Sequence, residues 1–275
     1  MKMPLRMTLW TLACLLAATL PLAAQDPGAS PVTAPPFSDS EVPLGLNLPT
    51  ADRLEGWDVG IRFTHRFQER ARGNGKDAYG LDGGAYSALG LDFGIGAVPG
   101  LNAQIYRTAD LKTFTVALQE RLLDTEHFKA ALRVERYDET VKGGLVGAAV
   151  QLPLDWHVGG GLVLSAVPTY LSATASARGV TTVGLGARWL FTEHQGVLGE
   201  YYPRPSKVDG AFEKGFALGY QYRTFRHRFT LMATNELGST AVHVLGGDYE
   251  HSDTYPGGPQ LPGNWVLGFN IVRAF

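Results

Sequence analysis

Hydrophobic and polar residues alternate along the chain from residue 57 onward. The first such stretch has one apolar face, formed by Trp57, Val59, Ile61 and Phe63. Its opposite face carries Asp58, Gly60, Arg62 and Thr64. A period of two is typical of a β-strand whose two faces meet different surroundings. We therefore predict a strand here, with one face against an apolar medium.

The same alternation returns along the rest of the chain, and no helical period competes with it after the N-terminal region. We predict twelve strands, at residues 57–64, 89–95, 101–106, 114–119, 130–135, 146–152, 162–170, 183–191, 197–202, 216–222, 229–233 and 265–271. Such a chain belongs to the all-β class.

The connections between these strands alternate between short and long. The short ones are residues 96–100, 124–127, 155–159, 192–195 and 223–226. The longer ones are residues 68–84, 107–112, 138–143, 172–180, 203–214 and 236–264. An up-and-down meander with an even number of strands places all short turns at one end, as outer-membrane barrels do. We expect both termini in the periplasm, and residues 68–84 and 236–264 as the major outer loops.

Two features favour lipid, rather than a protein core, against the apolar face. Aromatic residues fall near the strand ends, as interfacial girdles require: Trp57, Tyr137, Tyr170, Trp189, Tyr201 and Trp265. The polar face is too charged for the core of a soluble barrel; it carries Asp58, Arg62, Asp92, Arg133, Glu135, Arg188, Gln221 and Asn270. We predict an antiparallel up-and-down transmembrane β-barrel of about twelve strands, within a range of ten to fourteen. A soluble periplasmic barrel is the alternative.

The N-terminus has the pattern of a secretory signal peptide. Lys2 and Arg6 precede an apolar stretch, and Leu22-Ala23-Ala24 stands before Gln25 as a small-residue cleavage site. A membrane anchor is the weaker alternative, because the stretch is short and holds threonines and a proline. Cleavage would remove the single cysteine, Cys14, so we expect no disulfide in the mature protein.

The predicted organisation is a signal peptide at residues 1–24, a linker at residues 25–53 and a barrel at residues 54–275. Six prolines lie between residues 25 and 49, together with serines and few aromatic residues. This composition is typical of a linker, so we predict a periplasmic segment without packed structure. The predicted location is the outer membrane of a Gram-negative-type bacterium.

Net charge excludes one class of partner. The 24 Lys and Arg residues against 26 Asp and Glu residues give a formal charge of -2. Nucleic-acid binding would need a basic excess, so we predict no nucleic-acid partner. The expected partners are outer-membrane lipid, the barrel-assembly machinery and a small polar solute.

An ordered set of fragments resembles a family of bacterial proteins known as a β-barrel domain of unknown function. The fragments are VGIRFTHRF at residues 59–67, GLDFGIG at 90–96, LSAVPTYL at 164–171, VGLGARWLFTEHQGVLGEYYPRP at 183–205, FALGYQYRTFRHRFTLMATNE at 216–236 and GNWVLGFNIVRAF at 263–275. The resemblance implies an outer-membrane barrel and supplies no reaction, ligand or catalytic residue. The proline-rich segment and much of residues 138–154 lie outside it.

Lumen-facing side chains are the main functional candidates, because they determine what passes through a barrel. The pattern places these inside: Arg62, Arg66, Asp92, Arg133, Glu135, Arg188, Glu200 and Arg228. We predict a channel for passive or selective passage of a small polar solute. In the alternative, opposite charges pair and close the lumen, and the barrel is an anchor or docking platform for a periplasmic or surface partner.

One pair of residues could carry hydrolytic chemistry. His65 and Ser87 share the outer face on adjacent strands, where a lipid-modifying enzyme needs a nucleophile and a base. No carboxylate on that face orients the histidine, and no G-x-S-x-G motif is present. We therefore predict no enzymatic activity, with a lipid-modifying enzyme as the alternative.

Metal binding is a weaker candidate. The longest loop holds possible ligands at His243, Asp248, Glu250 and His251, without the spacing of a calcium site. An acidic surface loop with a short extra strand at residues 241–245 explains them as well. Four further histidines beside short turns (His127, His157, His194 and His227) lie about 10 Å apart, too far to share one metal. We predict no metal and no cofactor.

The chain ends on Phe275 at the end of an alternating strand. Outer-membrane barrels place the terminal aromatic residue of their assembly signal there. Arg273 interrupts the apolar face two residues earlier, so the signal is imperfect.

Overall fold

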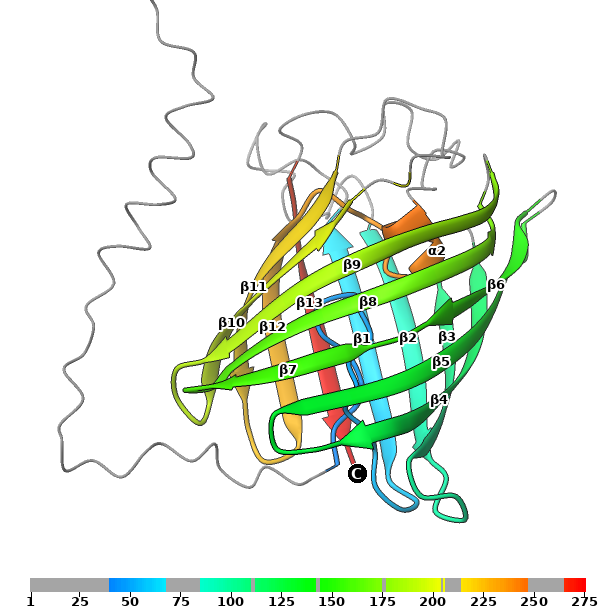
Figure 1. The fold of residues 1–275 in the computed structure, drawn as a ribbon. Helices are drawn as coiled ribbons and strands as arrows, with labels where there is room; N and C mark the ends of the chain where they lie inside the picture. The colour runs from blue at the N-terminus through cyan, green and yellow to red at the C-terminus, as the bar shows by residue number, and fades with distance from the viewer. Residues whose placement is uncertain are drawn as a thin grey trace, which may run out of the picture. The chain divides into compact units, whose positions relative to one another are not determined.

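Most strands predicted from the alternation pair with their sequence neighbours in one antiparallel sheet (Figure 1). The computed structural model describes residues 40–67, 85–109, 112–141, 144–174, 177–203, 205, 214–246 and 265–275. Their elements are β1 (Val59–Phe67), β2 (Ala85–Gly94), β3 (Leu101–Thr108), β4 (Thr113–Asp124), β5 (Phe128–Glu139), β6 (Val146–Gln151), β7 (Leu154–Gly159), β8 (Leu162–Ala173), β9 (Arg178–Leu190), β10 (Gln195–Tyr202), β11 (Gly215–Arg223), β12 (His227–Thr234), α2 (Ala241–Gly246) and β13 (Val266–Ala274).

The sheet closes into a barrel because the first strand pairs with the last. In this seam Gly60 lies opposite Ala274, and Arg66 lies opposite Gly268. The short strands β6 and β7 share one position, since both pair with β5 on one side and with β8 on the other. Pro153 separates them, and a proline cannot donate a ladder hydrogen bond. The barrel therefore has twelve strand positions, which confirms the predicted number.

The two ends of the barrel differ in their connections. Tight connections join β2 to β3, β4 to β5, β7 to β8, β9 to β10 and β11 to β12. They lie at the lower end in Figure 1, together with the C-terminus. We call this the short-turn end and the opposite one the long-loop end. In outer-membrane barrels the short turns face the periplasm.

Burial alternates along the strands as predicted. In β4 the apolar residues Phe114, Val116 and Leu118 are exposed on the outside, whereas Thr115 and Gln119 are buried inside. An outer belt of exposed apolar side chains around a polar interior is the pattern of a barrel that contacts lipid. Among the residues that the structure describes, no helix is long and apolar enough to cross a membrane.

Residues 40–56 form a loop inside the barrel, which we call the inner loop. Its apolar residues Val42, Leu44, Leu46 and Leu48 are at most 5% exposed. The prediction of a segment without packed structure is therefore wrong for residues 40–53, while residues 25–39 lie outside the described part. The proline-rich composition disfavours regular secondary structure, but it does not prevent an irregular loop from packing against the wall.

The segment that follows β12 also enters the barrel. We predicted a short strand at residues 241–245, and this prediction is wrong, because the helix α2 stands there. A closed barrel has no free sheet edge to which an extra strand can pair. The helix instead forms its own backbone hydrogen bond from Val244 N to Thr240 O, and it packs against β8 and β9.

Candidate functional site

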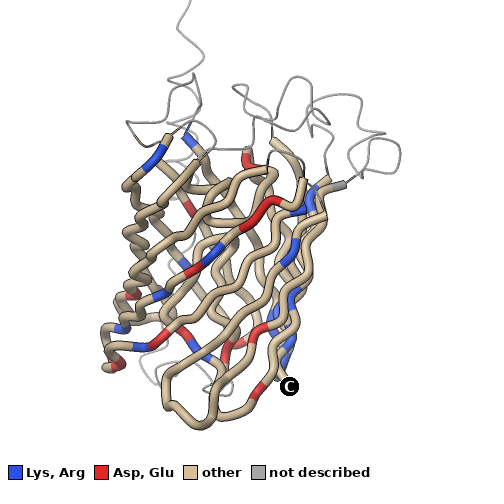
Figure 2. The backbone as a smooth tube through the Cα atoms, turned by 90° about the vertical axis from the view of Figure 1, so that its right-hand side faces the viewer, with Lys and Arg blue, Asp and Glu red and all other residues tan. Residues whose placement is uncertain are grey.

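The lumen contains all eight side chains that the sequence pattern placed there. Seven are buried in the barrel, namely Arg62, Arg66, Asp92, Arg133, Glu135, Glu200 and Arg228. The eighth, Arg188, keeps 15% of its side chain exposed. Figure 2 shows basic and acidic positions distributed along the strands of the wall. Their predicted role in selectivity stays a prediction.

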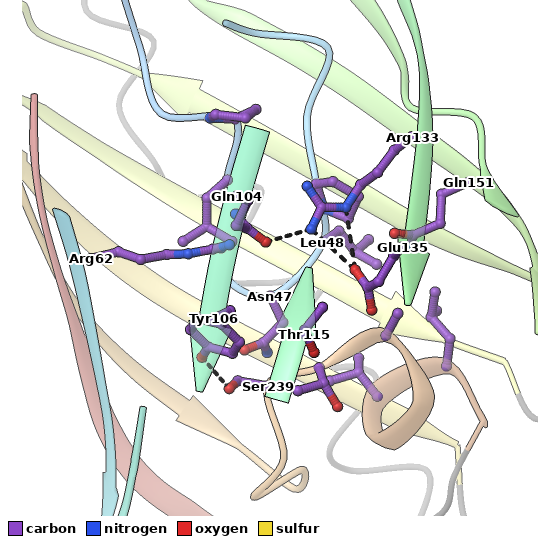
Figure 3. Close-up of a pocket in the computed structure, with 17 residues that line it drawn as sticks. Asn47, Leu48, Arg62, Gln104, Tyr106, Thr115, Arg133, Glu135, Gln151 and Ser239 are labelled. Atoms are coloured by element: carbon purple, nitrogen blue, oxygen red, sulfur yellow. Dashed lines mark hydrogen bonds and ion pairs between the residues drawn. The ribbon is translucent and has the colours of Figure 1, made fainter. Parts of the chain in front are cut away.

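Charged groups on β1, β2 and β5 pair along the wall rather than across the lumen. Arg62 lies 3.5 Å from Asp92 on the neighbouring strand, and its guanidinium covers the Tyr106 ring. Arg133 forms a 3.0 Å ion pair with Glu135. Gln104 accepts a hydrogen bond from Arg133 (Figure 3) and donates one to Asp92, and so it links the two pairs. This part of the wall is electrically balanced without closing the lumen.

The tip of the inner loop is held by one carboxylate. Glu200 accepts hydrogen bonds from the backbone N atoms of Leu46 at 2.6 Å, Asn47 at 2.9 Å and Leu48 at 3.2 Å. The Tyr202 hydroxyl donates to the same carboxylate at 2.5 Å. Converging donors of this kind offset part of the cost of burying a carboxylate.

A glycine makes this contact possible. A Cβ atom at Gly45 would collide with Oε1 of Glu200, so any other residue would force the carboxylate or the tip to move. Beside it, the Arg66 guanidinium donates to Asn47 Oδ1 at 2.9 Å, and Asn270 Nδ2 donates to Leu46 O at 2.7 Å. The tip is therefore bound by β1, β10 and β13 together.

Four basic side chains meet the acidic residues of the inner loop in the short-turn half of the lumen. We call them the basic cluster: Lys129 of β5, Arg188 of β9, Arg223 of β11 and Arg228 of β12. Glu41 contacts Arg223, and it lies 3.5 Å from Arg228 and 3.8 Å from Arg188. Asp52 lies 3.6 Å from both Arg188 and Lys129.

Charge holds Asp52 ionised. Burial acts to raise the pKa of this carboxyl, but Arg188, Lys129 and Arg228 together hold the pKa well below its usual value. The inner loop is thus attached to the basic cluster by carboxylates at neutral pH.

The returning arm of the inner loop binds the opposite wall. Ala51 N donates to Asp155 at 2.7 Å, and Gln119 donates to Thr50 O at 2.9 Å. At its base the two arms meet, since Glu41 N donates to Arg53 O at 2.7 Å. The loop therefore enters and leaves the lumen through the short-turn end.

The segment around α2 fills the lumen from the long-loop end. Ser239 lies 2.6 Å from the Tyr86 hydroxyl and also contacts that of Tyr106. Val244 and Leu245 share one apolar cluster with Leu46 and Leu48 of the inner loop. The two segments meet in the middle of the barrel.

Between these segments and the wall lies a small cavity of about 30 Å³ (Figure 3). Three buried oxygen atoms of its lining have no hydrogen-bond partner among the described residues: Thr115 Oγ1, Glu135 Oε1 and Gln151 Oε1. Buried polar atoms without a partner are rare in filled protein cores. The cavity is therefore suited to ordered water, which can donate hydrogen bonds to these atoms.

The predicted pair His65 and Ser87 is directly opposed in the β1–β2 ladder. No hydrogen bond joins the two side chains in the described part of the chain. The His65 ring instead packs against other rings of the outer surface, at 4.8 Å from Phe67 and 5.1 Å from Phe269. Nothing among the described residues orients the imidazole as a catalytic base requires.

The metal candidates are only partly described. His243 is buried and bonds to Thr240 at 2.8 Å and Glu139 at 3.2 Å, whereas Asp248, Glu250 and His251 lie outside the described residues. No group of three potential metal ligands occurs within the described ranges, and the histidines beside the short turns form no such group there either.

The C-terminal residue closes the seam. Phe275 N donates to Val59 O at 2.8 Å, and its ring is 47% exposed on the outside. The Arg273 guanidinium lies 4.5 Å above this ring, so the residue that interrupts the apolar face covers the terminal aromatic.

Sequence reasoning missed the inner loop and half of the basic cluster. Lys129 and Arg223 each stand in the inward phase of a strand whose other inward residues were identified, so this phase could have found them. Glu41 and Asp52 gave no signal, because a segment without periodicity does not show what it contacts.

Residues 161–275 match the family model described as a membrane bound beta barrel domain (DUF5777). This match confirms, for that part of the chain, the resemblance to a barrel family of unknown function. The search of curated proteins found no match.

Solved outer-membrane proteins are similar in structure at low sequence identity. An outer membrane channel from Pseudomonas putida F1 is 13% identical, over 86% of this chain and 100% of that one, with a TM-score of 0.49. Outer membrane protein Omp33 of Acinetobacter baumannii is 8% identical, over 80% and 98%, with a TM-score of 0.44. Outer membrane phospholipase A from Escherichia coli is 10% identical, over 90% and 98%, with a TM-score of 0.43.

Proposed function

We propose that this protein is an outer-membrane channel for small polar solutes, and that the inner loop closes it in the state described. One observation carries the proposal. The lumen has a polar wall, and the segments that fill it lie outside the sheet. Hydrogen bonds and ion pairs bind these segments to the wall, together with apolar contacts of Leu46 and Leu48. The polar contacts can be exchanged for water or solute without disturbing the barrel.

The cavity supports passage rather than a purely structural core. A core that only stabilises the barrel would fill its interior and satisfy its polar groups. Here Thr115, Glu135 and Gln151 keep oxygen atoms that find no partner among the described residues, beside a small cavity of about 30 Å³. Twelve strands also place this barrel between small filled barrels and wide porins.

The same loop favours a second candidate function. A barrel that is closed from both ends would suit a membrane anchor or a docking platform, whose partner binds at the short-turn end. In that case the inner loop is a permanent part of the core, and no condition that keeps the barrel folded opens it.

Single-channel recording in a planar bilayer tests the proposal. The refolded mature chain is compared with Glu200→Gln, which weakens the loop tip, and with Glu126→Gln, an exposed acid in a short turn, as the matched control. A heat-shifted gel band confirms folding. We expect rare conductance steps for the wild type and the control, and frequent steps for Glu200→Gln. Folded proteins that never conduct would refute the channel and leave the docking platform.

A further inference from the structure

The basic cluster is neutralised mainly by the inner loop. Glu41 is within 4 Å of Arg188, Arg223 and Arg228, and Asp52 is within 4 Å of Arg188 and Lys129. Both carboxylates reach the same Nη1 atom of Arg188. Two acidic groups of one loop thus occupy a site that four cations of the wall create.

The wall offers this cluster few acids of its own. Among the described residues, Asp155 is the wall carboxylate that faces the same region, where it accepts from Ala51 N and from Ser165 Oγ. Four cations against one wall acid leave an excess of positive charge once Glu41 and Asp52 are gone. In Figure 2 several basic positions lie near the C-terminus, at the short-turn end.

The other charged groups of the described lumen are paired or lie away from the basic cluster. Arg62 is paired with Asp92, and Arg133 is paired with Glu135, so this part of the wall is balanced. The buried Glu236 and the pair of Glu139 with His243 lie at the long-loop end. Glu200 adds one negative charge at the loop tip, and the nearby Arg66 adds one positive charge. An aqueous path past the basic cluster would therefore hold a positive potential.

We infer that the open lumen selects small anions, and that Glu41 and Asp52 occupy the place of the carboxylate groups of a transported solute. This inference rests on the proposed channel function and names its solute class. Arginine binds carboxylates with directed, charge-assisted hydrogen bonds, and rings of arginine and lysine line pores that select anions.

A second cavity lies where a solute would first meet the cluster. It has a volume of about 30 Å³ at the short-turn end and is lined by Glu41, Arg223 and Arg228 among others. An anion that enters there meets Arg223 and Arg228 in competition with Glu41. Solute binding and release of the inner loop are therefore coupled, because both use the same cations.

Reversal potentials across a potassium chloride gradient test this inference on the full mature chain. The double variant Glu41→Gln/Asp52→Asn detaches the loop and leaves the basic cluster intact. Adding Arg188→Gln to it removes the cation that both acids share. The matched control adds Arg178→Gln instead, which changes an exposed arginine at the other end of the same strand.

We expect the double variant to conduct more often than the wild type and to show a reversal potential of the sign set by chloride. Arg188→Gln should move that potential toward zero, whereas Arg178→Gln should not. Potassium succinate should reduce the chloride current of the double variant and have a weaker effect with Arg188→Gln.

Open channels that prefer potassium, or whose selectivity ignores Arg188→Gln, would overturn the inference while the channel function stands. Folded variants without any conductance would overturn both. If the double variant does not fold, the reversal potential of the spontaneous openings of the wild type measures the same ion selectivity.

Discussion

The contact between Glu200 and the loop tip is the sharpest point at which the closed state can be tested. Replacing Glu200 by Gln keeps the size of the side chain and one acceptor oxygen. It removes the charge, and it places an amide NH₂ opposite the backbone N–H of either Leu46 or Asn47, which donate to different oxygen atoms of the carboxylate. The Tyr202 hydroxyl also loses its charged acceptor.

The size of the effect follows from these bonds. A buried hydrogen bond to a charged group contributes about 1.5–3 kcal/mol, and the substitution removes about two of them. The closed state should therefore lose about 3–6 kcal/mol relative to the open one. Since about 1.4 kcal/mol is a factor of ten, the closed-to-open ratio should fall by about a hundredfold to ten-thousandfold.

Two measurements check this magnitude in the same membrane preparation. Hydrogen exchange should show faster exchange in the peptide that contains the amides of residues 46–48, and single-channel recording should show a higher open probability. Glu126→Gln should change neither. If Glu200→Gln leaves both exchange and open probability at their wild-type values, the carboxylate does not hold the loop and the reasoning fails.

Three further changes have expected outcomes. Gly45→Ala should displace the loop tip and raise the open probability, whereas Gly199→Ala, where a Cβ atom meets only a distant side chain, should not; equal conductance of the two would contradict the steric reading. The pKa of Asp52 is depressed in the closed state, so its ion pairs with the basic cluster are complete above the usual pKa of 3.8 and weaken as the pH falls below that value. The open probability should therefore rise in acid, and this rise should be smaller in Asp52→Asn. Deleting Phe275 should impair assembly into the membrane far more than deleting residues 27–35, and a heat-shift gel measures this. If both variants insert equally well, the C-terminal residue has no role in assembly.

Strand phase carried most of the correct predictions. A period of two fixes which side chains point inward as soon as one neighbour is assigned, so Arg62 and Arg133 could be placed in the lumen from the sequence. The alternation of short and long connections predicted the up-and-down topology. It could do so because the length of a connection is a local property of the chain.

The segments inside the barrel could not be predicted, because their contacts are not local. Leu46 and Glu200 are separated by 154 residues, and nothing near either of them encodes the hydrogen bond. The helix α2 was mistaken for a strand because a six-residue apolar segment fits both periods. The choice between helix and strand depends on closure of the barrel, because a closed barrel has no free edge to which this segment could pair as a strand.

The course of the inner loop has a topological consequence. Both of its arms pass through the same opening, with residue 41 beside residue 53, and the second arm continues into β1. The loop can therefore be withdrawn as a double-stranded loop, without threading a free chain end through the barrel.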